Sequence, residues 1–333
     1  MGFHLNFKNI FSISLGLSSV VSAAVIPRDS PSYYTRNLNT ITSIYQYTIY
    51  PNQLPIVAQA TQESIPQLAN LFSPTVAGRI QDIGNFTDFR TSIEYFFGLA
   101  PTPRAPKNGA ISAIDITQFS SGCPSVAAST VVFTISVWDD TTKSYGEVLT
   151  YLKQSGFWHF NDQGQVDYYD LNIPALGDFT GILQGVDFSS QLVQLLATKE
   201  VCAGAQAACT GANTQYYPNN GVSVNSILKS LGISLLNLSL IQQLDLGSLD
   251  LGGLNCFAQL TKKPFGDFNK LWSDSVVCRV VHLMLAVIDP VDHCPHVGPT
   301  GGMKCVNYGY EDRLFLSDAA LFGDVHRFVC PAS

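Results

Sequence analysis

The stretch from Phe157 to Pro174 constrains the fold of this chain more than any other. It reads FWHFNDQGQVDYYDLNIP, with two segments rich in aromatic and β-branched residues on either side of NDQG. Residues of this kind favour strands, and a glycine closing a short polar linker is typical of a three-residue hairpin loop. The sequence therefore predicts a β-hairpin with Gly164 in the left-handed conformation.

The expected register of this hairpin places Trp158 opposite Val166. The two-residue period of a strand then carries Tyr168, Asp170 and Asn172 onto the same face. One carboxylate among aromatic side chains on one sheet face is what a small-molecule pocket requires. We therefore predict that these five side chains line a ligand pocket.

Two helices are expected before the strands. Apolar residues recur at helical spacing over residues 37–50, and Pro51 ends the run. Asp88 is a favourable N-cap for a second helix over residues 89–97, whose SIEYFF segment carries Glu94. This helix would bring Glu94 to the predicted pocket.

The segment between these helices, residues 55–79, is polar and is interrupted by two prolines, so we expect it to be irregular. The pattern then changes to a period of two, which predicts four strands. They cover residues 111–119, 127–138, 148–160 and 165–173. Helices followed by long antiparallel strands predict an α+β domain over residues 37–176, in which a curved antiparallel sheet wraps the helices.

Residues 177–333 predict a second, mostly helical and cysteine-rich domain. Helices are expected over residues 191–202 and 276–288, and the tail 293–330 is expected to be rich in loops. Residues 222–253 are rich in leucine and regularly broken by Gly, Ser and Asp. Two Leu-Asp-Leu-Gly units are too few for a solenoid, so this segment is interpreted as an insertion.

The chain has eight cysteines, an even number that predicts four disulfides in an oxidising compartment. The spacing does not choose among the 105 ways of pairing eight cysteines. The predicted disulfide-bonded residues are Cys123, Cys202, Cys209, Cys256, Cys278, Cys294, Cys305 and Cys330.

The N-terminus predicts secretion. A lysine precedes an apolar run and a small-residue cleavage site, which together are typical of a signal peptide over residues 1–23. Residues 24–36 would follow as a loose segment. Asn85 and Asn237 stand in glycosylation sequons, which fit the secretory route. No other run is expected to span a membrane.

The charge of the chain limits its partners. Only 13% of its residues are charged, and the net charge is -7. A basic patch able to hold a nucleic acid backbone is therefore not expected. An unknown small molecule is the partner that the predicted pocket indicates, and the oligomeric state stays open.

Several motifs, taken together and in the order in which they occur along the chain, resemble the NTF2-like superfamily and, within it, the SnoaL-like branch. They are the helix that begins after Asp88 and the hairpin from Phe157 to Asp170, with its N-D-x-G-x-V turn and Y-Y-D strand. The SGCP, CRVVH and HCPHVGPTGG motifs further resemble a group of secreted fungal proteins with a cysteine-rich C-terminal region and no assigned activity. The resemblance implies an α+β cone whose pocket serves isomerases, cyclases and dehydratases as well as binders that do not catalyse.

Asp170 is the candidate catalytic residue. In the catalytic relatives implied by the resemblance, a carboxylate or histidine in the cone moves a proton at carbon beside a carbonyl. The alternative role for Asp170 is that of an ordinary hydrogen-bond acceptor at the sheet margin. His159 is expected on the face opposite Trp158, whereas Asp115 and Tyr168 could complete a polar set. The pairing of two histidines, a tyrosine and an aspartate found in the familiar dehydratases has no counterpart here.

His282, His293, Cys294, His296 and Cys305 resemble a zinc cluster, because imidazole and thiolate are the preferred ligands of zinc. Their spacing fits no standard site, and disulfides use the cysteines first in an oxidising compartment. We therefore expect no metal site and no cofactor.

Arg279 and His282 lie three residues apart on one face of an apolar helix. A buried pair with a carboxylate such as Asp289 is the expected role of these two residues.

Three functions remain open at this point. The first is a secreted protein whose aromatic pocket binds a small, weakly polar molecule. The second is a cofactor-free lyase, isomerase or cyclase that uses Asp170 as its general acid or base. The third is a secreted or cell-surface interaction protein in which the fold serves only as a scaffold.

Overall fold

The computed structural model describes residues 32–104, 107–218, 223–233, 238–309, 320–321, 323 and 327–331. The expected signal peptide and Asn237 lie outside these residues. The chain forms two compact units. We call residues 32–185, with the described residues from 308 onward, the sheet unit, and residues 186–307 the helical unit.

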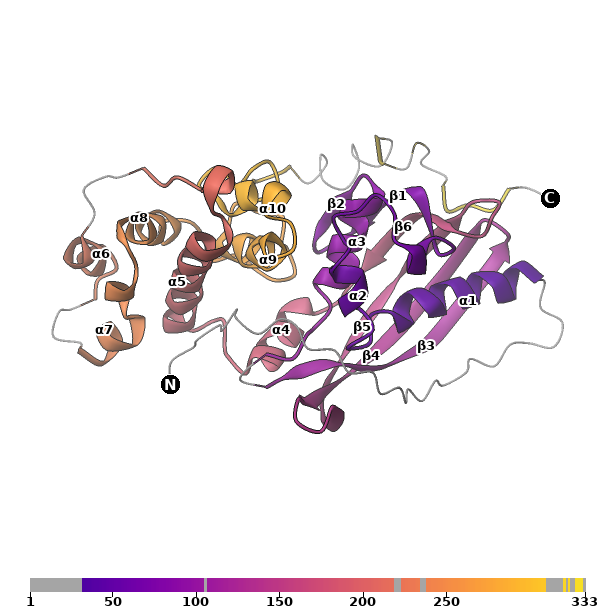
Figure 1. The fold of residues 1–333 in the computed structure, drawn as a ribbon, viewed down its shortest axis with the longest axis horizontal. Helices are drawn as coiled ribbons and strands as arrows, with labels where there is room; N and C mark the ends of the chain where they lie inside the picture. The colour runs from indigo at the N-terminus through magenta and orange to yellow at the C-terminus, as the bar shows by residue number, and fades with distance from the viewer. Residues whose placement is uncertain are drawn as a thin grey trace. The chain divides into compact units, whose positions relative to one another are not determined.

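The sheet unit contains one sheet of six strands in the order β2-β1-β6-β5-β4-β3 (Figure 1). The strands are β1 (Phe72–Ile80), β2 (Gly84–Phe86), β3 (Gly109–Cys123), β4 (Val126–Asp139), β5 (Ser144–Phe160) and β6 (Val166–Asn172). The four strands expected from the sequence are confirmed. All neighbouring pairs are antiparallel except β1 and β6, which run parallel.

Strand β1 corrects the expectation that residues 55–79 are irregular. Pro74 cannot donate a ladder hydrogen bond, but the register between β1 and β6 shifts between Phe72 and Ala77. Proline is tolerated in a strand at such an irregularity. The sequence pattern missed β1 because this shift breaks its two-residue period.

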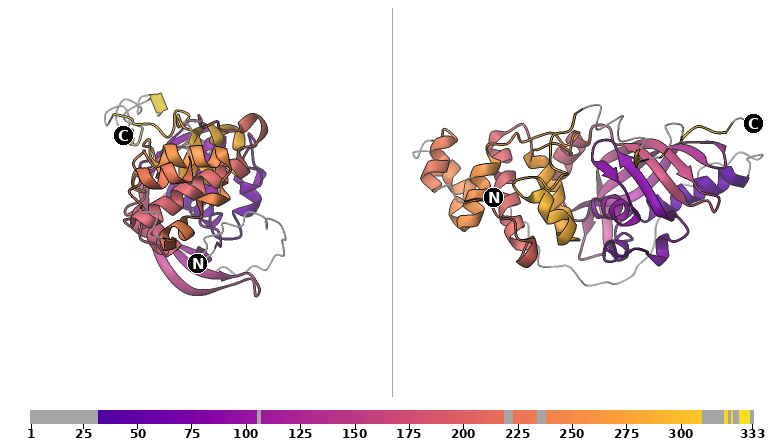
Figure 2. Two further views of the ribbon diagram at one scale, coloured as in Figure 1. Left: turned by 90° about the vertical axis from the view of Figure 1, so that its left-hand side faces the viewer. Right: turned by 90° about the horizontal axis from the view of Figure 1, so that it is seen from above.

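Helices cover one face of the sheet, which we call the inner face (Figure 1). The sheet unit contains α1 (Ser32–Gln46), α2 (Leu54–Val57), η1 (Pro66–Leu68), α3 (Phe89–Gly98) and α4 (Leu176–Gln184). Helix α1 begins within the segment expected to be loose, and α3 begins as expected, because the Asp88 side chain accepts a hydrogen bond from the backbone N–H of Thr91 at 2.8 Å. The long strands β4 and β5 bend, so the sheet is curved (Figure 2).

Aromatic rings fill the space between the helices and the inner face. Tyr45 of α1 packs edge-on against Trp158 of β5 at 5.8 Å and against Phe133 of β4 at 5.4 Å. Phe96 of α3 lies 6.3 Å from Trp158 and 6.1 Å from Tyr169 of β6. All five side chains are buried, so the concave side of the sheet is occupied by a packed aromatic core.

Gly78 provides a test of this packing. It pairs with Tyr169 across β1 and β6, and a Cβ atom on Gly78 would overlap the buried tyrosine ring. We expect Gly78→Ala to lower the free energy of unfolding by about 1–3 kcal/mol, the usual cost of overpacking. Gly84→Ala is the matched control, because a Cβ there meets nothing within 4 Å. Denaturant unfolding of both variants measures the difference, and equal stabilities would contradict this packing.

The helical unit packs around its own apolar core. It contains α5 (Gln191–Ala208), η2 (Gly211–Asn213), α6 (Val224–Ser230), α7 (Leu238–Leu244), η3 (Leu246–Ser248), α8 (Leu251–Leu260), α9 (Val276–Ala286) and α10 (Pro290–Val297). The expected helices near residues 191–202 and 276–288 are confirmed as α5 and α9. Helix α10 includes the first residues of the tail that was expected to be rich in loops. Asp289 caps this helix, and Pro290 stands at its start, where a missing N–H costs nothing.

The leucine-rich segment forms short helices in this unit. Ile227, Leu228, Leu244, Leu246 and Leu249 are buried in the core shared with α5 and α8. The aspartates that interrupt the leucines have local roles; for example, Asp250 caps α8 by accepting from the N–H of Gly253 at 2.8 Å. The segment therefore contributes to the core of the helical unit.

All eight cysteines form disulfides, as expected. The pairs are Cys123–Cys330, Cys202–Cys256, Cys209–Cys294 and Cys278–Cys305. Three of these disulfides lie in the helical unit, whereas Cys123–Cys330 attaches the end of the chain to β3. The described C-terminal residues thus pack in the sheet unit, although the sequence assigned them to the second domain.

None of the helices in the described part of the chain combines the length and apolar character needed to cross a membrane.

Candidate functional site

The predicted hairpin turn is confirmed. Gly164 has a φ of +79°, and its N–H donates to the carbonyl of Asn161 at 2.9 Å. The Asn161 side chain accepts from the N–H of Gln163 and of Gln165. Asn161 also donates its N–H to the carbonyl of Gln165 at 3.0 Å, so these two residues enclose a loop of three residues with a left-handed glycine at its end.

The predicted register of the hairpin is wrong. Trp158 pairs with Tyr169, and Phe160 pairs with Val166. The register shifts between His159 and Phe160, because Asp167 is the extra residue of a β-bulge. A bulge reverses the alternation of faces beyond it, so the residues of β6 after the bulge lie opposite to the expected side.

The five side chains predicted to share a face are therefore divided. Trp158 and Val166 are fully buried on the inner face. Tyr168, Asp170 and Asn172 alternate with buried Tyr169 and Leu171 and so lie on the other side, which we call the outer face.

Glu94 is not part of the outer face. It is fully buried on α3, where its carboxylate lies 3.9 Å from Nε of Arg90. Phe96, the residue of α3 that contacts Trp158, lies about 200° around the helix from Glu94. Glu94 therefore points away from the aromatic core.

A groove of about 450 Å³ lies on the outer face. We call it the outer groove. Its walls come from β3, β4, β5 and β6 and from the residue that follows β1, and its polar side chains are hydroxyls, amides and one carboxylate. They are Gln81, Gln118, Ser120, Thr130, Ser155, Asp170 and Asn172. Phe157 provides an aromatic surface, which is 51% exposed.

Asp170 is anchored at the edge of the outer groove. One carboxylate oxygen accepts from Nη2 of Arg79 at 2.5 Å, and the other accepts from the Gln81 amide at 3.2 Å. The side chains of Arg79 and Asp170 are only 6% and 12% exposed. Arg79 was not among the predicted site residues, although an arginine inside the apolar strand FSPTVAGRI indicates a buried charge in need of a partner.

A second polar network continues along the outer face. Nδ1 of His159 lies 2.5 Å from one oxygen of Asp167, and Arg327 donates to the other oxygen at 3.2 Å. The Arg327 guanidinium also lies over the Tyr168 ring at 4.2 Å. His159 is on the face opposite Trp158, as expected, but it lies outside the lining of the outer groove.

The end of the chain borders the exposed aromatic surface. The Phe328 ring lies 5.8 Å from the Phe157 ring. Asp115 was a candidate for the polar set of the site, but it is exposed on β3 outside the groove lining. Asp170 and Asn172 are therefore the predicted site residues that the structure brings together in a groove.

Arg279 is buried with a different carboxylate from the one expected. Its Nη2 lies 2.9 Å from Asp274, and its other N–H groups donate to the carbonyls of Ser275 and Gly298. Asp289, the expected partner, instead accepts from the first N–H groups of α10. The prediction of a buried arginine is confirmed, and its partner is corrected.

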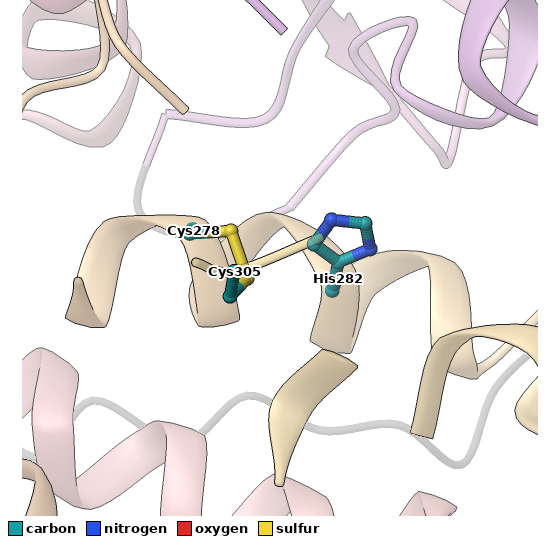
Figure 3. A group of neighbouring side chains, drawn as sticks. All are labelled: Cys278, His282 and Cys305. Carbon is teal, nitrogen blue, oxygen red and sulfur yellow. A yellow bond between two sulfur atoms is a disulfide. The ribbon is translucent and has the colours of Figure 1, made fainter. Parts of the chain in front are cut away.

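The cysteines that resembled zinc ligands are oxidised. Cys294 is bonded to Cys209, and the Cys278–Cys305 disulfide lies beside His282 (Figure 3). A thiolate is required for zinc ligation, so these sulfur atoms are unsuited to hold the metal.

The three histidines of the same motif lie close together. His282 and His293 are buried, and His296 is half-buried. Burial, together with the neighbouring histidines, Lys304 and Arg279, places the pKa of His282 well below its usual range. Burial and the charges of His293 and Lys304 lower the pKa of His296 to about 3.

Two family models match the chain. Residues 42–171 match the BfoA N-terminal domain, and residues 254–308 match the BfoA family C-terminal domain. The first match covers most of the sheet unit, and the second includes α9 and α10.

Curated fungal proteins are similar along most of the chain. Bifonsecin B biosynthesis cluster protein A of Aspergillus brasiliensis is 27% identical over 293 residues, which are 84% of this chain and 82% of the relative. Aurasperone B biosynthesis cluster protein A of Aspergillus niger is 26% identical over 250 residues, which are 72% of this chain and 69% of the relative. The resemblance to a group of fungal proteins is thus confirmed.

Solved structures are similar to somewhat less than half of the chain. A candidate SnoaL-like polyketide cyclase from Jannaschia sp. CCS1 has a TM-score of 0.33 and 11% identity, covering 48% of this chain and 100% of that chain. An NTF2-like protein with a cystatin-like fold from Novosphingobium aromaticivorans has a TM-score of 0.28 and 8% identity, covering 45% of this chain and 90% of that chain.

Proposed function

Since this chain carries both the N-terminal and the C-terminal domain of the BfoA family, we propose that it is a secreted binding protein for a small, weakly polar aromatic molecule. The ligand lies in the outer groove, against Phe157. The relatives belong to clusters for the biosynthesis of bifonsecin B and aurasperone B, so a product or intermediate of such a cluster is the ligand class we propose.

The observation that carries this proposal is the composition of the outer groove. An exposed phenylalanine on a sheet face offers a flat surface on which an aromatic ring can stack. Hydroxyl and amide groups around it, such as Ser155 and Asn172, can bond to the hydroxyl or carbonyl groups of the ligand. A largely apolar surface with a few convergent polar groups is the usual form of a small-molecule site.

The surroundings of Asp170 favour binding over acid–base catalysis. A general base needs an oxygen directed at the proton that it removes. Both oxygens of Asp170 already accept hydrogen bonds, from Arg79 and from Gln81. In our proposal this carboxylate fixes the edge of the groove, and the neutral hydroxyl and amide side chains around it bond to the ligand.

Secretion is part of the proposal. Four disulfides are stable in an oxidising compartment, and the start of the chain has the pattern of a signal peptide. Asn85 lies on β2 and is half-buried. We propose that it carries a glycan, as its sequon indicates, and that Asn237 does likewise.

The test is the affinity of purified protein for a panel of naphthols, measured by isothermal titration calorimetry. We expect Phe157→Ala to weaken binding by on the order of tenfold, because it removes the stacking surface. Tyr151→Ala is the matched control, since Tyr151 is another exposed aromatic residue on β5 and does not line the groove. Native mass spectrometry of protein from its own culture medium would reveal a ligand retained during purification.

The other outcomes distinguish the remaining functions. Turnover of a bound ligand that falls by on the order of a hundredfold in Asp170→Asn would support the lyase or cyclase. If neither the panel nor a copurified ligand binds, and Phe157→Ala behaves like wild type, the interaction protein is the better account.

A further inference from the structure

Three imidazole rings converge between the last two helices of the helical unit. His282 belongs to α9, and His293 and His296 belong to α10. Nδ1 of His282 lies 3.3 Å from Nδ1 of His293 and 3.1 Å from Nδ1 of His296. One ring nitrogen from each histidine lies within 4.8 Å of the other two. This cluster lies outside the sheet unit and has no part in the function proposed above.

The local sequence explains why the rings meet. His293 and His296 are three residues apart, so they lie on the same face of α10. Helices α9 and α10 pack against each other across a short turn, which ends where Asp289 caps α10. This packing brings His282 opposite the two histidines of α10.

Two disulfides fix the surroundings of the cluster. Cys294, directly after His293, is bonded to Cys209 at the end of α5. Cys278, one turn before His282 on α9, is bonded to Cys305 (Figure 3). A disulfide therefore anchors each helix near its histidines, so the three rings are positioned before any ligand binds.

The spacing of the nitrogens fits a tetrahedral metal ion. Zinc binds imidazole nitrogen at about 2.0–2.1 Å, and two ligands of a regular tetrahedron are then separated by about 3.3–3.4 Å. The two measured separations, 3.1 and 3.3 Å, are close to this value. Nδ1 of His282 is close to two other ring nitrogens, but the Nδ1 of a neutral imidazole makes only one well-directed hydrogen bond. A cation among the rings would instead bind one lone pair from each of the three nitrogens.

The electrostatic surroundings are mixed. Burial favours the neutral form of imidazole, which is the form that binds metals. Arg279 pairs with Asp274 at 2.9 Å, but Lys263 shares the same carboxylate at 2.8 Å, so the charge of Arg279 is only partly balanced. Lys304 places a positive charge close enough to disfavour protonation of His282 and His296, and that charge would also oppose a bound cation.

We propose that His282, His293 and His296 form a three-imidazole site for a divalent transition-metal ion of the zinc class, with a fourth position open to water or a small anion. Three histidines with one open position are a known donor set for zinc. The site needs no cysteine, so oxidation of all eight cysteines leaves it intact. The expectation of no metal site was based on the cysteines and histidines taken as one cluster, whereas this proposal concerns the histidines alone.

The experiment uses the full-length, oxidised protein and titrates it with Co²⁺ and then with Zn²⁺. We expect one equivalent of Co²⁺ to give the intense visible absorption of a tetrahedral ion, and Zn²⁺ to displace it. His296→Gln should weaken Co²⁺ binding by at least about a hundredfold, because it removes one of three ligands. His296 is the half-buried member of the cluster, so this variant disturbs the core least. His159→Gln, in the sheet unit, is the matched control and should bind like wild type.

A second variant does not depend on removing a ligand. Lys304→Gln removes a nearby positive charge and should strengthen Co²⁺ binding several-fold at low salt. The metal should also raise the unfolding temperature of wild type more than that of His296→Gln. Three results would overturn the proposal: wild type that binds no Co²⁺, equal binding by wild type and His296→Gln, or binding that requires prior reduction of the disulfides.

Discussion

Replacing Trp158 with alanine is expected to lower the free energy of unfolding of the sheet unit by about 3–5 kcal/mol, the usual cost of removing a large aromatic side chain from a core. The Trp158 ring is fully buried and packs against Tyr45, Phe96 and Tyr169 at 5.8–6.3 Å. Its Nε1–H donates to Ser129 at 2.9 Å, so the substitution also removes the donor to a buried hydroxyl. Denaturant unfolding, followed by circular dichroism, measures the change.

Phe157 is the control for this prediction, because it directly precedes Trp158 on β5 and lies on the outer face of the sheet. It is 51% exposed and contacts Phe328, so Phe157→Ala should cost less than about 1 kcal/mol. The two variants together test the corrected register of the hairpin. A larger loss of stability in Phe157→Ala than in Trp158→Ala would show that the faces are assigned the wrong way round.

Replacing Arg279 with leucine is expected to destabilise the helical unit by about 3–5 kcal/mol, the scale of breaking a buried ion pair from one side. The guanidinium is fully buried and donates to the carbonyls of Ser275, Gly298 and Pro299. It also pairs with Asp274. The variant would leave these groups without their donor, so thermal unfolding of the oxidised protein should show a lower midpoint for this unit.

Lys263→Leu is the matched control for Arg279→Leu. Lys263 also pairs with Asp274, at 2.8 Å, but its side chain is partly exposed. An ion pair of this kind contributes about 1 kcal/mol or less, because water screens it. Equal losses in the two variants would mean that the stabilisation comes from the charge on Asp274 alone and that the carbonyl contacts of Arg279 contribute little.

Local features of the sheet unit were predictable to the residue. The cap at Asp88 and the left-handed glycine at Gly164 both depend on hydrogen bonds between residues no more than three apart. The four expected strands were found from their alternation of side chains. Strand β1 was not, because its shift near Pro74 breaks that alternation.

The candidate site was predictable only in part. Asp170 and Asn172 lie in a groove as expected, but on the outer face and without Trp158. Phe157 was within the predicted hairpin, yet its role depends on the register. The bulge at Asp167 that sets this register lies beside His159 and Arg327, and Arg327 is 160 residues away in the sequence.

The sequence by itself determined the turn, the periods of the strands and helices, and the oxidised state of the cysteines, because each follows from neighbouring residues or from composition. Tertiary structure alone decided which face of β6 is buried, which cysteines pair, and that Arg79 meets Asp170 from 91 residues away. It also brought His282 to His293 and His296. The physical reason is that these features depend on contacts between elements, whose free energy becomes available only when the helices and strands pack together.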